Sequence, residues 1–361
     1  MESEVPAESI HYFIAADVGG TNARFRVVKR STQDSTYRKV VLEKSFQASE
    51  FESIDDIFMN LLGSINARIS ICTLAIAGPK DGRKVQVTNI PKWGWIDAEE
   101  LKQKFGFEKF FLLNDFEANG YGATFVDIEK SEDCIVINEG VQVPGGNKFI
   151  IGPGTGLGCA IIIYNKAEGD YNVHPGEGGH TEYPIVDEVD LRLKNFAIDY
   201  LKRVDNVEID RVSVERLTAG PALPLIYEFF KLEHPELEVV LEAKSKKGEV
   251  SGKEILSKAL NEKDPLCVMV LEQFIKHLAI LTGDIALITL AYGGIYLCGG
   301  VAVALKNYLR SEECKFKQIM TKKGRFSERV ANMPVYLLTH EPGLDGAEQY
   351  GLQALINNYE E

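Results

Sequence analysis

Two glycine-rich turns, each lying between strand-like stretches, are the first places in this sequence that could do chemistry. The first follows the apolar run YFIAAD. Glycines let backbone N–H groups approach a phosphate closely, a threonine hydroxyl can donate a hydrogen bond, and a carboxylate can orient a hydrated Mg²⁺. The alternative is a plain β-hairpin turn, and the Walker pattern GxxxxGK[ST] is absent from the chain. The turn consists of Asp17, Val18, Gly19, Gly20, Thr21 and Asn22.

The second turn lies in GPGTGLG (152–158), again with apolar residues on both sides. Its spacing does not satisfy GxGxxG, and the GCAIIIY that follows is typical of a strand rather than the helix that a dinucleotide-binding fold requires. A tight turn is the alternative. Four glycines and one threonine in seven residues favour contact with phosphate, through Gly154, Thr155 and Gly156.

A carboxylate follows the apolar stretch FFLL, where Asn114 and Asp115 precede Phe116. The carboxyl end of a strand is where α/β enzymes bind ligands, and a kinase needs a carboxylate to accept the proton of the attacking hydroxyl. The other interpretation is the N-cap of the next helix. Spacing alone favours the cap.

Two further glycine-rich segments carry candidate binding groups. In PGEGGH (175–180), Glu177 can accept hydrogen bonds from sugar hydroxyls, and His180 can donate or accept one. A surface loop remains an alternative, and so does a metal site with His174, although metal sites usually offer more ligands. In CGGV, Gly299 and Gly300 suit either the approach of a nucleotide's ribose or base, or a tight turn between strand and helix.

Composition restricts the class of protein. The net charge of −13 argues against a nucleic-acid or anionic-membrane partner, because both require a basic surface. The longest apolar stretch, residues 266–292, is interrupted by charged residues and predicts a buried helix. Neither a signal peptide nor a transit peptide is evident. Six cysteines without a CxxC pair predict reduced thiols in a reducing compartment, the cytoplasm.

The elements that must position these residues alternate between strands and helices. Strand-like segments end at the first turn and at residue 115, and residues 51–65 carry apolar side chains at helical spacing. A second series of strand, glycine turn and strand occupies residues 133–164, which suggests an internally duplicated α/β architecture with a mixed sheet. The charged stretch 232–254 predicts a surface excursion.

Taken together, these stretches resemble the bacterial-type glucokinase family, within the actin-like and hexokinase-like ATPase superfamily. They occur in the family's order and cover nearly the whole chain. The resemblance implies an α/β, two-domain hexokinase-like (ribonuclease H-like) ATPase fold with an interdomain cleft, with domains at 1–124 plus 343–361 and at 125–342. The matching stretches are DVGGTNAR (17–24), AIAGP (75–79), LLNDFEA (112–118), GPGTGLG, PGEGGH, SVERLTAGP (213–221), GGIYLCGGV (293–301) and KGRFSERVANMPVYLLTHEPGLDGA (323–347).

The activity that the resemblance implies is transfer of the γ-phosphate of ATP, with Mg²⁺, to the 6-hydroxyl of glucose, with Asp115 as the general base. Both turns would hold phosphates, Gly299 and Gly300 would lie on the nucleoside side, and no role follows for Arg24 or Arg325. Family members often form homodimers. The implied sugar-binding residues are Asn114, Asp115, Glu177, His180 and Glu215.

One departure and two alternatives accompany the resemblance. The residues after His180, TEYPIVDEVD, lack the cysteines of the zinc motif found in the related repressor, open-reading-frame and kinase family, so no zinc-dependent member is expected. A non-catalytic sugar sensor of the same fold and a kinase for another hexose remain alternative functions.

Overall fold

The computed structural model describes residues 6, 9–20, 22–34, 36–128, 132–241 and 250–359. These residues form two compact units. Unit 1 consists of Met1–Val126, Tyr171–Pro175 and Glu341–Glu361, and unit 2 of Asp127–Asp170 and Gly176–His340. Part of the charged stretch predicted as a surface excursion, residues 242–249, lies outside the described residues.

Unit 1 is built on a mixed sheet with the strand order β3-β2-β1-β4-β8, in which β1 pairs antiparallel with β2 and parallel with β4. A small sheet of short strands, β5-β6-β7, precedes α2. The elements are β1 (Ile10–Val18), β2 (Asn22–Ser31), β3 (Arg38–Gln47), α1 (Ile54–Leu62), β4 (Ile71–Ile76), β5 (Lys80–Asp81), β6 (Lys84–Gln86), β7 (Trp95–Asp97), α2 (Ala98–Phe105), β8 (Lys109–Leu113), α3 (Asp115–Thr124) and α12 (Gly343–Ile356).

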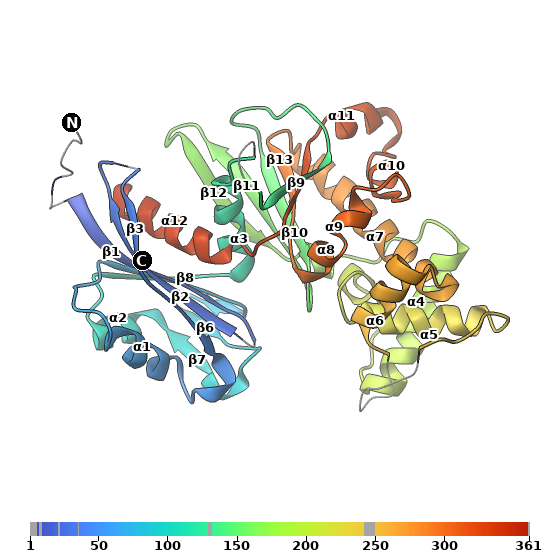
Figure 1. The fold of residues 1–361 in the computed structure, drawn as a ribbon, viewed down its shortest axis with the longest axis horizontal. Coiled ribbons are helices and arrows are strands. Elements are labelled where there is room, and N and C mark those ends of the chain that lie inside the picture. Colours follow the sequence, from blue (N-terminus) through green and yellow to red (C-terminus); the bar gives the residue numbers. More distant parts are fainter. Residues whose placement is uncertain are drawn as a thin grey trace. The chain divides into compact units, whose positions relative to one another are not determined.

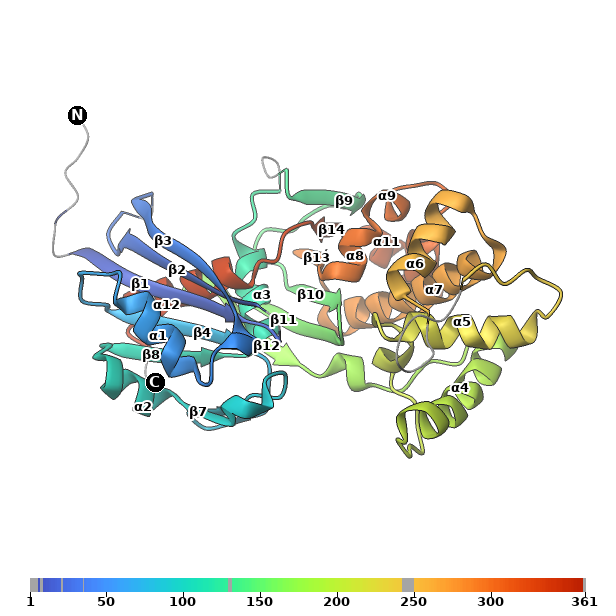
Figure 2. The same ribbon diagram turned by 60° about the horizontal axis from the view of Figure 1, so that its bottom comes forward.

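Helices cover both faces of this sheet, and the central strand β1 is therefore apolar on both sides. On one face, Ile14 packs in a cluster with Phe58 of α1. On the other, Phe13 packs against Leu352 of α12, the C-terminal helix. Figures 1 and 2 both place α12 on the side of the sheet away from α1. With water excluded from both faces, the sheet is a firm support for the turns at its strand ends.

The helix α12 is also tied to the sheet by charge. Glu348 is almost fully buried, yet it accepts hydrogen bonds from Arg38 at 2.6 and 2.8 Å and from Arg30 at 3.1 Å. Burial alone would raise the pKa of Glu348, but these guanidinium groups outweigh it and hold the pKa below its usual value. These ion pairs therefore fix the position of α12 on the sheet, through residues of strands more than 300 positions away in sequence.

A second mixed sheet has the strand order β12-β11-β10-β13-β14-β9, and its strands belong to unit 2 except for Tyr171–Pro175 of β12, which belong to unit 1. The segment GCAIIIY lies in β11, as the sequence predicts. The elements are β9 (Cys134–Asn138), β10 (Lys148–Pro153), β11 (Leu157–Asn165), β12 (Asp170–Gly176), α4 (Glu188–Tyr200), α5 (Ala222–Glu233), α6 (Gly252–Ser257), α7 (Pro265–Thr289), β13 (Gly294–Leu297), α8 (Gly300–Ala304), α9 (Lys306–Leu309), α10 (Phe316–Met320), α11 (Ser327–Ala331) and β14 (Val335–Leu338).

The long helix α7 is the centre of the core of unit 2, and the predicted buried helix is confirmed. Its length and composition would suffice to cross a membrane, and it is the one such helix in the described residues. Most of its apolar side chains, such as Phe274 and Leu278, are instead buried in the unit's main hydrophobic cluster. Two polar side chains on the same helix, Gln273 and His277, are buried as well.

Candidate functional site

The first glycine turn joins β1 to β2 in unit 1. The N–H of Gly19 donates to the carbonyl of Asn22 at 2.9 Å, which closes the turn, while Gly20 is exposed. Val18 ends β1 and is buried. Thr21, the predicted hydroxyl donor, lies outside the described residues. The turn therefore presents backbone at the end of a rigid hairpin, as a phosphate contact requires.

Asp17 precedes this turn and forms an ion pair with Arg24, its partner in the β1–β2 register. Arg24 also pairs with Glu341, at 2.6 Å. Burial raises the pKa of Asp17, and the guanidinium of Arg24 works against that rise. No role for Arg24 followed from the sequence, although the symmetry of a tight hairpin centred on residues 20 and 21 would have placed it opposite Asp17.

Asn114 and Asp115 lie at the junction of β8 and α3, also in unit 1. The Asn114 side chain is the N-cap: its Oδ1 accepts from the N–H of Phe116 at 2.9 Å, and Glu117 closes a capping box by accepting from the N–H of Asn114 at 3.2 Å. Asp115 is the first residue of the helix, and its Oδ1 also accepts from the N–H of Phe116, at 3.0 Å. The cap predicted from spacing is therefore present, and Asn114 supplies it. Asp115 is held at the carboxyl end of a buried strand.

The predicted sugar loop belongs to unit 2, where Glu177 precedes a short 3₁₀ turn, Gly178–His180. Both predicted side chains are largely exposed, and the carboxylate of Glu177 lies 3.7 Å from Nε2 of His180. Under the loop lies Cys159 of β11: its thiol donates to the carbonyl of Gly176, with sulfur and oxygen 3.4 Å apart, and its sulfur accepts from the N–H of Gly178 at 3.3 Å. Cys159, which no sequence pattern singled out, thus fixes the loop backbone on either side of Glu177.

The second glycine turn joins β10 to β11 in the same unit. The N–H of Gly154 donates to the carbonyl of Gly156 at 2.8 Å, and Thr155 at the tip is exposed. Glu215, the predicted sugar ligand from SVERL, lies against this turn, and its Oε2 accepts from the N–H of Leu157 at 2.9 Å. The structure therefore places a predicted sugar residue beside a predicted phosphate residue within one unit.

The junction between β13 and α8 adjoins the same turn. Gly299 has a φ of 85°, in the region that favours glycine, and a Cβ there would lie 2.7 Å from the carbonyl oxygen of Pro153. Gly300, the first residue of α8, is exposed. Gly299 and Gly154 are therefore close neighbours at the carboxyl ends of β13 and β10, the edge where α/β sheets bind ligands.

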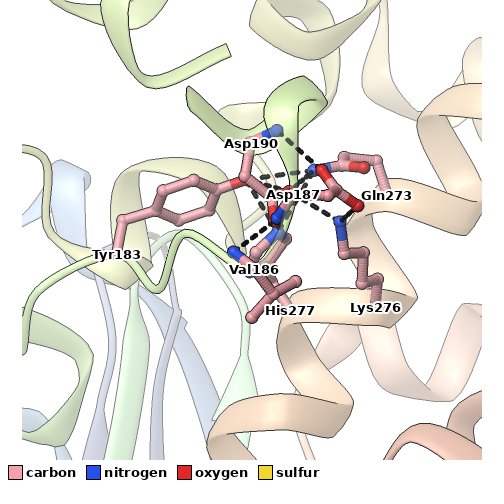
Figure 3. Close-up of polar contacts among 7 residues, drawn as sticks. All are labelled: Tyr183, Val186, Asp187, Asp190, Gln273, Lys276 and His277. Atoms are coloured by element: carbon pink, nitrogen blue, oxygen red, sulfur yellow. Dashed lines mark hydrogen bonds and ion pairs between the residues drawn. The ribbon is translucent and has the colours of Figure 1, made fainter. Parts of the chain in front are cut away.

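Just beyond the sugar loop, unit 2 contains a buried cluster of polar side chains that sequence reasoning did not find (Figure 3). Asp190 is fully buried and accepts from His277, Lys276 and Gln273. The hydroxyl of Tyr183, three residues after His180, lies 2.7 Å from Nε2 of His277. The polar cluster of Tyr183, Asp190, Gln273, Lys276 and His277 thus fixes the chain segment that follows the sugar loop onto α7.

Comparison with known proteins decides the family. The family model described as glucokinase matches residues 14–354. A glucokinase from Helicobacter acinonychis is 31% identical over 347 residues, covering 95% of this chain and 96% of the relative. The chain belongs to the glucokinase family.

Two solved structures of relatives support the fold. A glucokinase from an Antarctic psychrotroph has a TM-score of 0.77 and 27% identity, covering 94% of this chain and 98% of that structure. A ROK-family glucokinase from Streptomyces griseus, in complex with glucose and AMPPNP, has a TM-score of 0.58 and 20% identity, covering 95% of this chain and 99% of that structure. The hexokinase-like ATPase fold is confirmed, and membership of the family makes the chain a kinase that acts on glucose.

Proposed function

We propose that this glucose kinase transfers the γ-phosphate of MgATP to the 6-hydroxyl of glucose, and that Asp115 is the general base. The observation that carries the proposal is the position of Asp115, at the first turn of α3 directly after a buried strand. The capping box of Asn114 and Glu117 fixes the backbone on which that carboxylate stands. A base that must meet one particular hydroxyl benefits from such a rigid support.

The acceptor would be bound by oxygen-rich side chains from three segments. A neutral polyol suits such a site, because each carboxylate oxygen accepts a hydroxyl hydrogen in a charge-assisted bond. A sugar that lacks one hydroxyl would leave a carboxylate unpaired and bind less well. The proposed sugar-binding residues are Asn114, Asp115, Glu177, His180 and Glu215.

The donor would be held by backbone rather than by cationic side chains. The two glycine turns present N–H groups, and Asp17 would orient the Mg²⁺ that arrives with ATP, since a carboxylate oxygen is a ligand that Mg²⁺ prefers. The complex of the Streptomyces griseus relative with glucose and AMPPNP supports this choice of ligands. The proposed nucleotide-binding residues are Asp17, Val18, Gly19, Gly20, Thr21, Asn22, Gly154, Thr155, Gly156, Gly299 and Gly300.

In the proposed reaction, Asp115 accepts the proton of the 6-hydroxyl as that oxygen attacks the γ-phosphorus. The bond from the γ-phosphorus to the bridging oxygen breaks, and ADP leaves with the electron pair. The N–H groups of the turns stabilise the charge on the transferring phosphoryl group. The products are glucose 6-phosphate and MgADP.

The acceptor and the site of phosphorylation can be tested in one assay. ADP release from MgATP is measured across a panel of hexoses, and the product is passed to glucose-6-phosphate dehydrogenase. We expect glucose-dependent ADP release with an equal yield of NADPH. Phosphorylation of glucose without NADPH would contradict the 6-hydroxyl, and a strong preference for another hexose would contradict glucose as the natural acceptor. Glucose that binds without any ADP release would instead indicate a sugar sensor.

The assignment of the sugar loop has its own test. Replacing Glu177 by Gln removes the negative charge at an exposed position and should raise the KM for glucose. The KM for MgATP should stay close to that of the wild type. A change confined to the KM for MgATP would show that the loop is wrongly assigned.

A further inference from the structure

The stretch AIAGP (75–79) leads into the short strand β5 of unit 1 and has no role in the proposed reaction. The N–H of Gln86 in β6 donates to the carbonyl of Pro79 at 3.0 Å. Gly78 has a φ of 151° and packs closely against the backbone of Gln86, where a Cβ would lie 2.0 Å from the carbonyl oxygen. Lys80, the residue after Pro79, therefore extends from a backbone that is held in place.

The side chain of Lys80 reaches the strand that leads to the proposed base. Its Nζ donates to the carbonyl of Leu112 in β8, at 2.7 Å. Among the described residues, β8 is an edge strand of its sheet. Backbone groups alternate between the two edges of a strand, and the N–H of Lys109 faces β4, because it donates to the carbonyl of Ser70. The carbonyl of Leu112, three positions further on, therefore faces the open edge, where Lys80 supplies its hydrogen-bond donor.

The charge of Lys80 also acts on Glu117, whose carboxylate closes the capping box of α3. Burial raises the pKa of Glu117, and the ammonium of Lys80 is the strongest of the influences that oppose this rise. His174 of β12, Tyr121 of α3 and Tyr350 of α12 interact electrostatically with the same carboxylate. Burial raises the pKa of both phenols, so they stay neutral. Lys80 therefore favours the ionised form of the residue that caps α3.

We propose that Lys80 is a positioning residue for phosphoryl transfer: by bonding the carbonyl of Leu112 and attracting the carboxylate of Glu117, it fixes the start of α3, where Asp115 stands. This inference rests on the proposed role of Asp115 as the base. Lys80 acts on both sides of that residue, on the end of the strand before it and on the capping group after it. Such support matters because a displacement of about 1 Å at a reacting group can reduce the rate about 10²-fold.

Steady-state kinetics of the full chain with glucose and MgATP, recorded as a function of pH, test this role. The key variant is Lys80→Met, which keeps a long side chain but has neither the donor nor the charge. We expect kcat to fall about 10-fold and the KM for MgATP to stay within about twofold of the wild type, as for the loss of one charge-assisted hydrogen bond beside the base. Lys80→Arg keeps both the donor and the charge and should restore most of the turnover.

The pH profile separates this role from a general loss of stability. Without the cation of Lys80, the pKa of Glu117 rises further, so its carboxyl group is protonated at higher pH and caps α3 less well. The acid limb of the kcat profile should therefore move to higher pH in Lys80→Met. Glu117→Gln retains a side chain that can close a capping box but cannot titrate in this range. In that background, Lys80→Met should leave the acid limb where it is.

The matched control is Lys84→Met, the same change in β6 of the same small sheet, at a lysine that pairs with Asp97 at 2.9 Å. It should leave kcat within about twofold of the wild type and the acid limb in place. Wild-type kcat and pH profile in Lys80→Met would overturn the inference and leave the proposed function intact. A shift of the acid limb that persists with Glu117→Gln, or that disappears when His174 is replaced by Gln, would also overturn it. A wild type without glucose-dependent ADP release would instead refute the proposed function.

Discussion

The buried polar cluster around Asp190 provides the sharpest prediction about stability. The carboxylate accepts from Gln273 at 2.7 Å and from Lys276 and His277 at 2.8 Å, all on α7. Burial alone would raise the pKa of Asp190, but the hydrogen bonds from His277 and Lys276 outweigh it and hold the pKa below its usual range. The carboxylate is therefore ionised in the folded protein, and its charge is matched to buried donors.

Replacing Asp190 by Asn keeps the shape and removes that charge. Lys276, whose side chain is only 18% exposed, would then retain Asp187 as its acidic partner. The N–H₂ of the new amide group is itself a donor, and it would face the donor groups of α7 that the carboxylate had accepted from. Leaving a buried donor without its acceptor costs about 1–3 kcal/mol in the free energy of unfolding. The control is Asp284→Asn on the same helix, whose carboxylate is half exposed and pairs with Lys323. That change should cost less than about 1 kcal/mol.

Urea unfolding followed by far-UV circular dichroism measures both variants. A loss of less than about 1 kcal/mol for Asp190→Asn would refute the argument, because it would show that the buried charge is not needed by its partners. A loss equal to that of Asp284→Asn would have the same meaning.

The cluster also sets a pH dependence through His277. Burial lowers the pKa of this imidazole despite the neighbouring carboxylate, and within the described residues its Nδ1 has no hydrogen-bond partner. Below about pH 6.5 the unfolded chain therefore binds a proton that the folded chain does not, so stability falls as the pH drops from about 7 to 5. Replacing His277 by Gln should flatten this part of the profile, and an unchanged slope would contradict the assignment.

Two further predictions concern residues that position the proposed site. Cys159→Ala removes both hydrogen bonds to the backbone of Gly176 and Gly178, so the KM for glucose should rise about 3- to 10-fold, as expected for the loss of about 1 kcal/mol. Cys159→Ser should restore part of the lost affinity for glucose. Equal KM values for the wild type and both variants would exclude a positioning role for Cys159. Arg24→Gln removes the guanidinium that opposes the burial-raised pKa of Asp17, so the acid limb of the kcat/KM profile for MgATP should move to higher pH. An acid limb at the same pH in the wild type and the variant would exclude this influence of Arg24 on Asp17.

The sequence predicted the parts of the fold that depend on local pattern. The strand after the second glycine turn, the amphipathic helix now seen as α1 and the buried helix α7 all follow from periodicity in one segment. The short strands β5 to β7 were missed, because two or three residues carry no periodic signal and take their conformation from pairing.

Contacts between distant segments were beyond the reach of sequence patterns. Asp190 and His277 are 87 positions apart, and Cys159 lies 19 positions from Gly178. Glu215 was assigned to sugar by resemblance, and nothing in SVERL indicates that its carboxylate also accepts the N–H of Leu157. Such pairings arise only when the sheet and α7 have been assembled.

The central claim, that Asp115 is the base of a glucose kinase, is tested most directly by the turnover of Asp115→Ala and Asp115→Asn. Glucose binding by both variants is measured by calorimetry beside ADP release from MgATP. We expect kcat to fall by at least about 10²-fold in both variants, the lower range for loss of a general base, while glucose affinity falls much less. Turnover within about threefold of the wild type would contradict the assignment and remove Asp115 from the reaction.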